Sequence, residues 1–408
     1  MWFYIKLAWR NIFRNKRRTI IAGIAIGVGL ASMIFTDALL IGMKDSMIKS
    51  ATDSYLGEGQ IHRKGFRLTQ EVEKTIRGLD ELLTSLEKEK EIEHFSLRTT
   101  SFGMINSPAN FTSVLLVGVV PEKEKNITQI DDVIVEGSYF AGDNIRDIII
   151  GSELAELLEA GLGDRVVVTV SQAGTGDLSQ ELFRISGIYR FNIKEMDRGF
   201  AFVRLSKAQE MLGLGNNVHE IVLKFKDRQF SYRDNSAFWE KYSTNDNEAV
   251  SWTEIMPEIK LIFGLVWISI AFLGIILFGI VAFGIINTLF MSIYERLFEF
   301  GVIRAVGTRP SGVRKLVIFE AGALSLVSIA MGSLLGLALT LLFSKLGIDY
   351  RGIEFAGSTI TEMLYPVLHI RQFIIYPLAT FLFTILTSLY PALAASRMKI
   401  SEAMRKSM

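Results

Sequence analysis

Four long apolar runs constrain this chain more than any other feature of its sequence. A helix that crosses a bilayer needs about 20 predominantly apolar residues, and the runs span residues 19–43, 261–293, 317–346 and 373–396. The second and fourth contain no charged residue, and Glu320 lies near an end of the third, where we expect it to reach the membrane interface. The sequence predicts four transmembrane helices, and an even number places both termini on one side.

The Lys and Arg residues that flank the runs predict the orientation, because cytoplasmic loops are enriched in them. Residues 1–18 contain six and no acid, residues 294–316 contain five against two acids, and residues 397–408 contain four against one. Residues 44–260 contain 26 against 35 acids, and residues 347–372 contain two basic residues. The first three segments are therefore predicted to be cytoplasmic, and the last two to lie outside.

The N-terminus is predicted to be a retained anchor. Its apolar run is longer than the roughly 7–15 residues of a signal peptide, and no convincing A-x-A cleavage site follows it. Residues 2–18 also fit an amphipathic helix on the inner membrane surface, with apolar residues on one side and basic residues facing lipid phosphates. A basic flank without that role is the alternative.

The long segment between the first two runs is predicted to be an α+β domain with a stalk at each end. Apolar residues at helical spacing predict a helix over residues 71–93. Short β-branched and aromatic runs bounded by Gly, Asp and Asn predict strands. The predicted strands are 111–120, 147–150, 165–170, 183–189, 201–203 and 220–225, and shorter helices are predicted at 152–160 and 206–212.

Motifs for catalysis and metal binding are absent from the sequence. It contains no phosphate-binding G-x-x-x-x-G-K-[ST] loop, no H-E-x-x-H and no G-x-S-x-G. Cysteine is absent, and the four histidines are scattered along the chain. We therefore expect no catalytic residue, metal site or cofactor in this chain, and a net charge of +1 gives no indication of nucleic-acid binding.

Small residues recur within the apolar runs at a spacing that favours close helix packing. Gly23 with Gly27, and Gly332 with Gly336, form two G-x-x-x-G pairs. Charges inside the runs are too scarce for an ion-coupled transporter, and Asp37 lies near the end of the first run, where an interfacial role fits better. The glycine pairs therefore predict helix packing or dimerisation.

The segment YERLFEFGVIRAVGTRP, residues 294–310, separates the second run from the third. Phe298, Val302 and Ala305 recur at i, i+4 and i+7, which predicts one apolar helical face. Gly307 is placed to end the helix, and Pro310 to begin the next one. Such a short amphipathic helix needs something to dock against, and a connector lying on the membrane is the alternative.

Several stretches together resemble one family. The pattern E-R-x-x-E-[FI]-G-[VI]-[IL]-R-A-[VI]-G at 295–307 resembles the coupling helix of FtsX/MacB-type (type VII) ABC transporter permeases. Residues 7–29 and 390–405 are similar to the first helix and the ending of the same family. Gly163-Asp164, residues 185–189 and the stretch AFVRLSKAQEMLGL at 201–214 resemble its membrane-proximal, periplasmic-type domain.

The resemblance implies an architecture, a mechanism and partners. Such permeases have four transmembrane helices with a porter-like part and an inserted β-rich part between the first two. They act as dimers of two copies or paralogues, and motion is transmitted from a cytoplasmic ATPase pair that binds ATP and Mg²⁺. The family's ATPase-contacting positions, carried over onto this chain, are Glu295, Arg296, Glu299, Gly301, Arg304 and Gly307.

Size and the separate ATPase favour the lipoprotein-releasing LolC/LolE type within this family. The resemblance implies a multi-pass protein of the bacterial inner membrane that extracts lipoproteins and delivers them to a periplasmic carrier. The residues expected to face acyl chains are Met33, Leu40, Phe263, Val266 and Ile270. Residues 171–181 are too short and polar for a carrier-binding hook, so we expect a plain hairpin there. A MacB-like exporter with an adaptor and an FtsX-like regulator of a cell-wall hydrolase are the alternatives.

Overall fold

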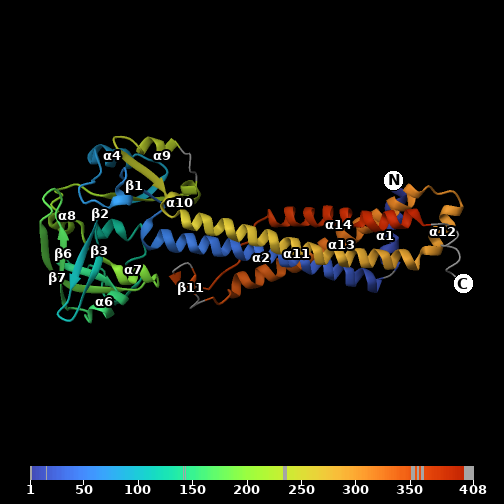
Figure 1. Ribbon diagram of the computed structural model, residues 1–408, viewed down its shortest axis with the longest axis horizontal. Coiled ribbons are helices and arrows are strands. Elements are labelled where there is room, and N and C mark those ends of the chain that lie inside the picture. The colour runs from blue at the N-terminus through green and yellow to red at the C-terminus, as the bar shows by residue number, and fades with distance from the viewer. Residues whose placement is uncertain are drawn as a thin grey trace. The chain divides into compact units, whose positions relative to one another are not determined.

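The computed structural model divides the chain into two compact units. It describes residues 2–14, 16–140, 142, 144–232, 237–350, 354–355, 358–359 and 363–398. The first unit, here called the helical unit, comprises residues 1–45, 263–349 and 364–408. The second, the β-rich unit, comprises residues 46–262 and 350–363. The chain passes from one unit to the other within two long helices, at residues 45–46 and 262–263 (Figure 1), and again at residues 349–350 and 363–364.

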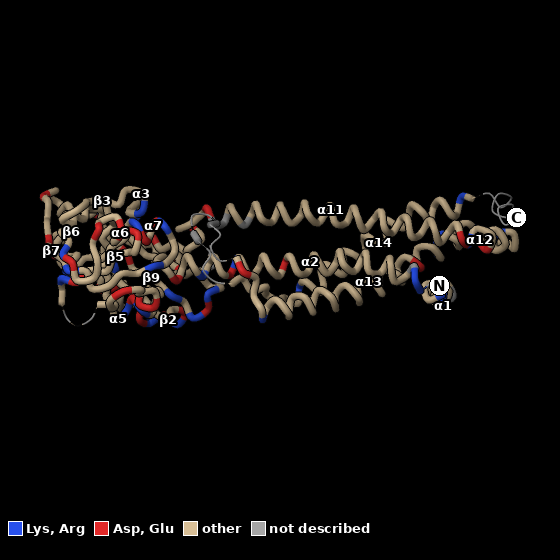
Figure 2. Tube along the Cα trace, turned by 90° about the horizontal axis from the view of Figure 1, so that it is seen from below, with Lys and Arg blue, Asp and Glu red and all other residues tan. Residues whose placement is uncertain are grey.

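The helical unit contains the membrane-spanning helices. Its helices are α1 (Trp2–Arg14), α2 (Lys16–Ala51), α11 (Pro257–Glu295), α12 (Leu297–Ala305), α13 (Pro310–Leu346) and α14 (Gln372–Arg397). Among the described residues, four helices are long and apolar enough to cross a membrane, at Thr19–Leu56, Gly264–Glu295, Pro310–Leu346 and Gln372–Arg397. Figure 2 shows few charged residues along α11, α13 and α14, and several where α1 and α12 lie. The predicted four spans, with a large β-containing domain after the first, are confirmed.

Glycines let α2 and α13 approach closely in the helical unit. A Cβ atom added to Gly332 would lie 2.6 Å from the carbonyl oxygen of Gly27, and one added to Gly336 would lie 3.3 Å from Cα of Ala31. A Cβ atom on Gly23 would lie 3.5 Å from Sδ of Met331. The structure thus places both predicted glycine pairs at this helix contact. Lipid supplies no hydrophobic driving force between helices, so such close backbone packing stabilises their association.

The β-rich unit is built on one ten-stranded sheet with short helices around it. Its strands are β1 (Gly59–Arg63), β2 (Ile92–Asn106), β3 (Phe111–Val119), β4 (Ile134–Gly137), β5 (Asp147–Gly151), β6 (Arg165–Ser171), β7 (Leu178–Tyr189), β8 (Phe200–Arg204), β9 (Glu220–Phe225) and β10 (Asn247–Ser251). The order is β10-β1-β9-β2-β3-β8-β5-β7-β4, and β6 pairs with β2 and β7. β3 runs parallel to β8 and β5 runs parallel to β7, whereas the other pairs are antiparallel.

Short helices and one small hairpin complete this unit. They are the π-helix η1 (Thr52–Leu56), α3 (Phe66–Thr69), α4 (Leu79–Leu86), α5 (Pro121–Glu124), α6 (Ser152–Leu158), α7 (Lys194–Gly199), α8 (Leu205–Leu212), the 3-10 helix η2 (Arg228–Tyr232), α9 (Ala237–Tyr242), α10 (Trp252–Ile255), and the strands β11 (Glu354–Phe355) and β12 (Ser358–Thr359). The strands and helices predicted from residue 111 to residue 225 all form, with ends shifted by a few residues.

Strand β2 joins two of the three hydrophobic cores of this unit. Its first half pairs with β9 over Ile92–Arg98, and its second half pairs with β3 and β6. One core collects around Val168, Phe183 and Ile185, and the other around Leu223 and Trp239. A single long strand therefore belongs to both parts of the domain.

The predicted helix at 71–93 is wrong over most of its length. Only Leu79–Leu86 is helical, and β2 begins at Ile92. Gly78 adopts φ of +65° directly before α4, a conformation that interrupts a helix. Ile76 is buried, and its N–H donates to the carbonyl of Val218. The apolar spacing therefore arises from an irregular segment that packs on the core and from one short helix.

A buried ion pair fastens the end of the first long helix to the sheet. The Arg98 guanidinium contacts the Glu124 carboxylate at 2.5 Å, and the two side chains are 0% and 1% exposed. Arg98 also donates to the carbonyl oxygen of Tyr55 in η1 at 2.6 Å, while Ser96 donates to Glu124 at 2.8 Å. Several hydrogen bonds offset the desolvation of both charges, as a buried pair requires.

Substituting Gly332 by alanine tests the α2–α13 contact. We expect Gly332→Ala to lower the stability of the helical unit by about 1–3 kcal/mol, because the added methyl meets rigid backbone. Gly279→Ala is the matched control, since a Cβ atom there has no neighbour within 4 Å. Thermal unfolding of the purified chain is the measurement, and equal midpoints for the two variants would contradict the packing.

Removing Arg98 tests the buried ion pair. We expect Arg98→Ala to destabilise the segment around β2 by about 3–5 kcal/mol, because Glu124 remains buried without its partner. Arg63→Ala removes a partly exposed pair with Asp246 and should cost about 0–1 kcal/mol. Hydrogen exchange of the β2 amides measures both effects. Unchanged exchange in Arg98→Ala would show that the pair does not hold this region together.

Candidate functional site

Helix α12 is separated from its neighbours by two breaks in the backbone. Arg296, between α11 and α12, has φ of −108° and ψ of 16°, which are not helical values. Gly307 follows α12 with φ of +106°, a conformation that glycine tolerates. Pro310 is then the first residue of α13. The two breaks leave a nine-residue helix at the end of the helical unit where α1 also lies (Figure 1).

One face of α12 is buried within the helical unit. Leu297, Phe300 and Gly301 are buried. Leu297 and Phe300 belong to an apolar cluster with Ile293, Val313, Leu316, Val317, Ala392 and Ala395. The cluster joins the ends of α11 and α14 to the start of α13. The cluster holds α12 by a face that differs from the apolar face predicted from the sequence.

The predicted apolar face of α12 is exposed. Phe298 is 46% exposed and Val302 is 38% exposed, and Val306, one residue past the helix end, is 85% exposed. Ala305 is also exposed. We call Phe298, Val302, Ala305 and Val306 the α12 outer face. Large apolar side chains at a polar helix end are typical of a surface that another protein covers.

A polar network, here called the Glu320 network, ties α12 to α1 and α13. Arg296 donates to Glu320 at 2.5 Å and to Glu299 at 2.9 Å. Arg14 of α1 donates to the other oxygen of Glu299 at 3.0 Å, and Asn11 donates to Glu320 at 2.6 Å. Glu320 is 6% exposed, so its carboxylate is satisfied by partners within the protein. Burial next to an Arg satisfies its charge within the protein.

The charges of this network shift the pKa values of Arg296 and Glu299. Burial acts to lower the pKa of Arg296, but the Glu320 and Glu299 carboxylates outweigh it and raise that pKa. Burial acts to raise the pKa of Glu299, and hydrogen bonds from Arg296 and Arg14 reverse this and lower it. The contribution of Glu299 to stability is thus present above the pKa of an unfolded glutamate and is lost as the pH falls through its lowered folded value.

Arg304 links α12 to the end of α14. Its guanidinium donates to the carbonyl oxygen of Met398 at 2.5 Å and to that of Ser396 at 3.3 Å. The last carbonyls of a helix have no partner within the helix, so a cation at this position caps α14 and complements its dipole. Arg304 therefore has an internal structural role.

The six residues assigned to ATPase contact occupy different environments. Arg296 and Gly301 are buried, Arg304 bonds to α14, and Glu299 is half-buried in the network. Glu295 and Gly307 are exposed. The motif residues therefore mainly fix the position of α12 within the helical unit. The α12 outer face provides its exposed apolar surface. Asn11 and Arg14 were missed, because no spacing rule links α1 to residues about 300 positions away.

The residues expected to face acyl chains lie on α2 and α11. Met33, Leu40, Val266 and Ile270 are half-buried, and the side chain of Phe263 lies outside the described part of the structure. Met33 packs near Gly274 and borders a cavity of only about 10 Å³ with Leu277 and Phe278. A cavity of this size is too small to hold an acyl chain.

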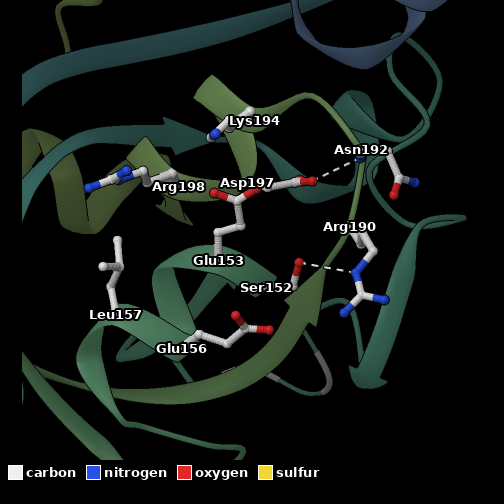
Figure 3. Close-up of a pocket in the computed structure, with 9 residues that line it drawn as sticks. All are labelled: Ser152, Glu153, Glu156, Leu157, Arg190, Asn192, Lys194, Asp197 and Arg198. Carbon is white, nitrogen blue, oxygen red and sulfur yellow. Dashed lines mark hydrogen bonds between the residues drawn. The ribbon is translucent and has the colours of Figure 1, made fainter. Parts of the chain in front are cut away.

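A second candidate, a hollow of about 610 Å³, lies in the β-rich unit (Figure 3). It is lined by Ser152, Glu153, Glu156, Leu157, Arg190, Asn192, Lys194, Asp197 and Arg198. The Asp197 carboxylate accepts the N–H groups of Phe191 and Asn192, both at 2.8 Å, and Arg190 donates to Ser152 at 3.1 Å. Three acidic and three basic side chains line the hollow, so they give it no net charge. The Asp197 carboxylate is already occupied by the backbone of its own loop.

The segment 171–181 forms a plain hairpin. β6 and β7 pair up to Ser171 and Leu178, which leaves a six-residue loop at 172–177. Gln172 donates its N–H to Asp177, and Gly174 donates to the Glu73 carboxylate. Among the described residues, no group of three His, Cys, Asp or Glu side chains is arranged to hold a metal ion.

Comparisons with known proteins match both parts of the chain. The FtsX-like permease C-terminal model matches residues 262–400, and the MacB-like periplasmic core domain model matches residues 19–229. The lipoprotein-releasing system transmembrane protein LolC of Xylella fastidiosa is 23% identical over 317 residues, which cover 71% of this chain and 72% of that protein. The LolE protein of Haemophilus influenzae is 21% identical over 352 residues, which cover 81% and 82%. The crystal structure of the periplasmic region of MacB from Actinobacillus actinomycetemcomitans is 15% identical, with a TM-score of 0.34, over 50% of this chain and 92% of that one.

Two substitutions separate the buried and exposed parts of the Glu320 network. We expect Glu320→Ala to destabilise the end of the helical unit by about 3–5 kcal/mol, because the Arg296 charge stays buried. Glu299→Ala should cost about 0.2–1 kcal/mol, since the side chains of Arg14 and Glu299 are 55% and 42% exposed and water screens the pair. Hydrogen exchange of the α12 amides is the measurement. If the two variants exchange alike, Arg296 is not held by Glu320.

Proposed function

We propose that this chain couples a separate ABC ATPase to lipoprotein release. The proposal starts from its family: the chain belongs to the FtsX-like permeases with a MacB-like periplasmic core domain. The chain is a permease of the LolC/LolE/MacB/FtsX type and a multi-pass membrane protein. In our proposal both termini and α12 lie in the cytoplasm, and the β-rich unit lies in the periplasm. The enrichment of the short flanks in Lys and Arg supports this orientation.

The observation that carries the proposal is the arrangement of α12. Its inner face and the Glu320 network hold it firmly, while its outer face presents Phe298, Val302 and Val306 to solvent. A rigidly held helix with uncovered apolar residues is suited to dock in a groove of another protein and to transmit its movement. We assign that groove to a cytoplasmic ATPase dimer, which binds ATP and Mg²⁺, because the chain has no phosphate-binding loop of its own.

Lipoproteins are the proposed substrate. The relatives LolC and LolE are named for a lipoprotein-releasing system. Apolar residues on α2 and α11 offer a surface for acyl chains, and Met33 and Ile270 are among them. In our proposal the outer leaflet of the inner membrane supplies the lipoprotein, and a second permease copy or paralogue faces this surface. Large exposed side chains on α11, including Trp267 and Phe283, support such a partner.

Export of peptides or drugs with an adaptor protein is the second candidate. The match of the MacB-like core domain over residues 19–229 favours it. The plain hairpin at 171–181 also offers no extended hook for a periplasmic carrier. An adaptor that copurifies with the complex would favour export over lipoprotein release.

The absence of cysteine makes the proposed orientation directly testable. Val306→Cys introduces a unique thiol at an 85% exposed site beside α12, and Leu178→Cys introduces one at a 74% exposed site in the β6–β7 hairpin. In intact spheroplasts, we expect a membrane-impermeant maleimide to label Cys at 178 and to label Cys at 306 only after lysis. The opposite pattern would invert the orientation.

Introducing a charge on the α12 outer face should weaken ATPase docking without affecting the folding of the chain. We expect Phe298→Asp and Val302→Asp each to weaken ATPase association at least about tenfold, because a carboxylate would be desolvated in the groove. The unfolding temperature should stay near that of the parent, since both side chains are exposed. Leu178→Asp is the control for an added surface charge. Parent-like ATPase association in both α12 variants would refute the docking assignment.

Purified complex distinguishes the two substrate classes. We expect ATP hydrolysis to rise on addition of an acylated lipoprotein and not on addition of the same protein without its acyl chains. Depletion of the permease should leave lipoproteins in the inner membrane. Stimulation by the unacylated form alone would remove the lipoprotein assignment while leaving the ATPase contact intact.

A further inference from the structure

Helix α1 has an apolar stripe that no described residue of the chain covers. Trp2, Ile5, Trp9 and Phe13 recur at i, i+3, i+7 and i+11, which places them on one face, and all four are exposed. Trp2 is 78% exposed, and the Trp9 and Phe13 rings contact each other with centroids 5.5 Å apart. A different face, which includes the buried Ala8 and Ile12, packs inside the helical unit. The stripe is thus an outward surface of a helix that is itself fixed.

Basic side chains flank this stripe. Lys6 and Arg10 are exposed one turn apart beside it, and Lys16 and Arg17 follow at the start of α2. The sequence contains no acid before Asp37, so no carboxylate of this segment neutralises these cations. Tryptophan and cations side by side on an amphipathic helix are typical of a helix that lies in the interface of an anionic membrane.

We propose that α1 is a binding surface for the headgroups of anionic phospholipids, with its aromatic stripe in the acyl region and Lys6 and Arg10 on the phosphates. Charge complementarity selects this occupant, since a second copy of α1 would bring like charges together. The apolar surface also continues along the start of the first span, where Ile20, Ile21 and Ile24 are exposed. The hydrocarbon region therefore begins next to the stripe.

Lipid bound at α1 holds α12 as well. The Thr19 hydroxyl donates to the carbonyl of Ile12 at 2.6 Å and closes the turn between α1 and α2. Arg14, one turn beyond Arg10, donates to Glu299, and Asn11 donates to Glu320. Both contacts belong to the Glu320 network. Anionic lipid thereby becomes a positioning ligand for the helix that we assign to ATPase docking.

The inference rests on the proposed function only for the leaflet involved, which is the cytoplasmic one. Its test uses the full chain alone, so a failure here does not affect the ATPase assignment, and a failure of that assignment leaves lipid binding measurable. The probe is dibrominated phosphatidylglycerol in neutral detergent, with dibrominated phosphatidylcholine as the neutral counterpart. Bromine quenches tryptophan fluorescence on contact, and Trp2→Phe/Trp9→Phe defines the part of the signal that arises from α1.

We expect phosphatidylglycerol to quench the α1 tryptophans at far lower concentration than phosphatidylcholine. Lys6→Gln/Arg10→Gln should weaken this affinity about 30-fold, because each cation near an anionic surface contributes about fivefold. Lys6→Arg/Arg10→Lys should keep the affinity, which excludes misfolding as the cause. Lys88→Gln/Lys90→Gln removes two exposed cations from the β-rich unit and should change nothing.

Four results would overturn the proposal. They are equal quenching by both lipids, parent-like affinity in Lys6→Gln/Arg10→Gln, displacement of phosphatidylglycerol by inorganic phosphate, and loss of quenching as protein concentration rises. The third would indicate a site for free anions, and the fourth would indicate that a second copy covers the stripe. Phosphatidylglycerol-selective quenching that depends on Lys6 and Arg10 would establish the lipid surface.

Discussion

The buried pair of Arg296 and Glu320 is the interaction on which the arrangement at this end of the helical unit depends. Each charge is shielded from water, and neither is tolerable there without the other. Because Arg296 sits at the break between α11 and α12, the pair fixes the direction in which α12 leaves α11. Asn11 and Arg14 extend the same network to α1, so a helix distant in sequence joins α12 and α13 in one electrostatic unit.

A buried arginine also organises the β-rich unit. Arg98 lies on β2, which contributes to two of the hydrophobic cores, and it bonds Glu124 and the backbone of η1. Apolar packing alone would stabilise each core without specifying how the stalk residues meet the sheet. A hydrogen-bonded charge is satisfied in few geometries. Both buried arginines therefore fix the relative orientation of the segments that they join, in addition to stabilising them. This suits a protein proposed to transmit movement through its helices.

The errors of sequence-based prediction have identifiable physical causes. The segment 71–93 shows helical spacing, but Gly78 breaks the helix and the hydrogen bond from Ile76 to Val218 ties its first part to the core. Strands β1 and β10 escaped prediction because buried polar residues such as Gln60 and Asn247 disrupt their apolar pattern. The partners of Glu320 were not predicted, because Asn11 and Arg296 bear no fixed spacing to it in the sequence.

The sequence by itself determined the spans, the α+β domain and the family, because hydropathy and local motifs are properties of contiguous residues. It also determined the apolar face of α12 and the glycine pairs, since both follow from helical periodicity. Only the tertiary structure decided which motif residues are buried, that Arg304 caps α14, and that Arg14 reaches Glu299. Those contacts join residues 92 to 285 positions apart, and no local pattern encodes such pairings.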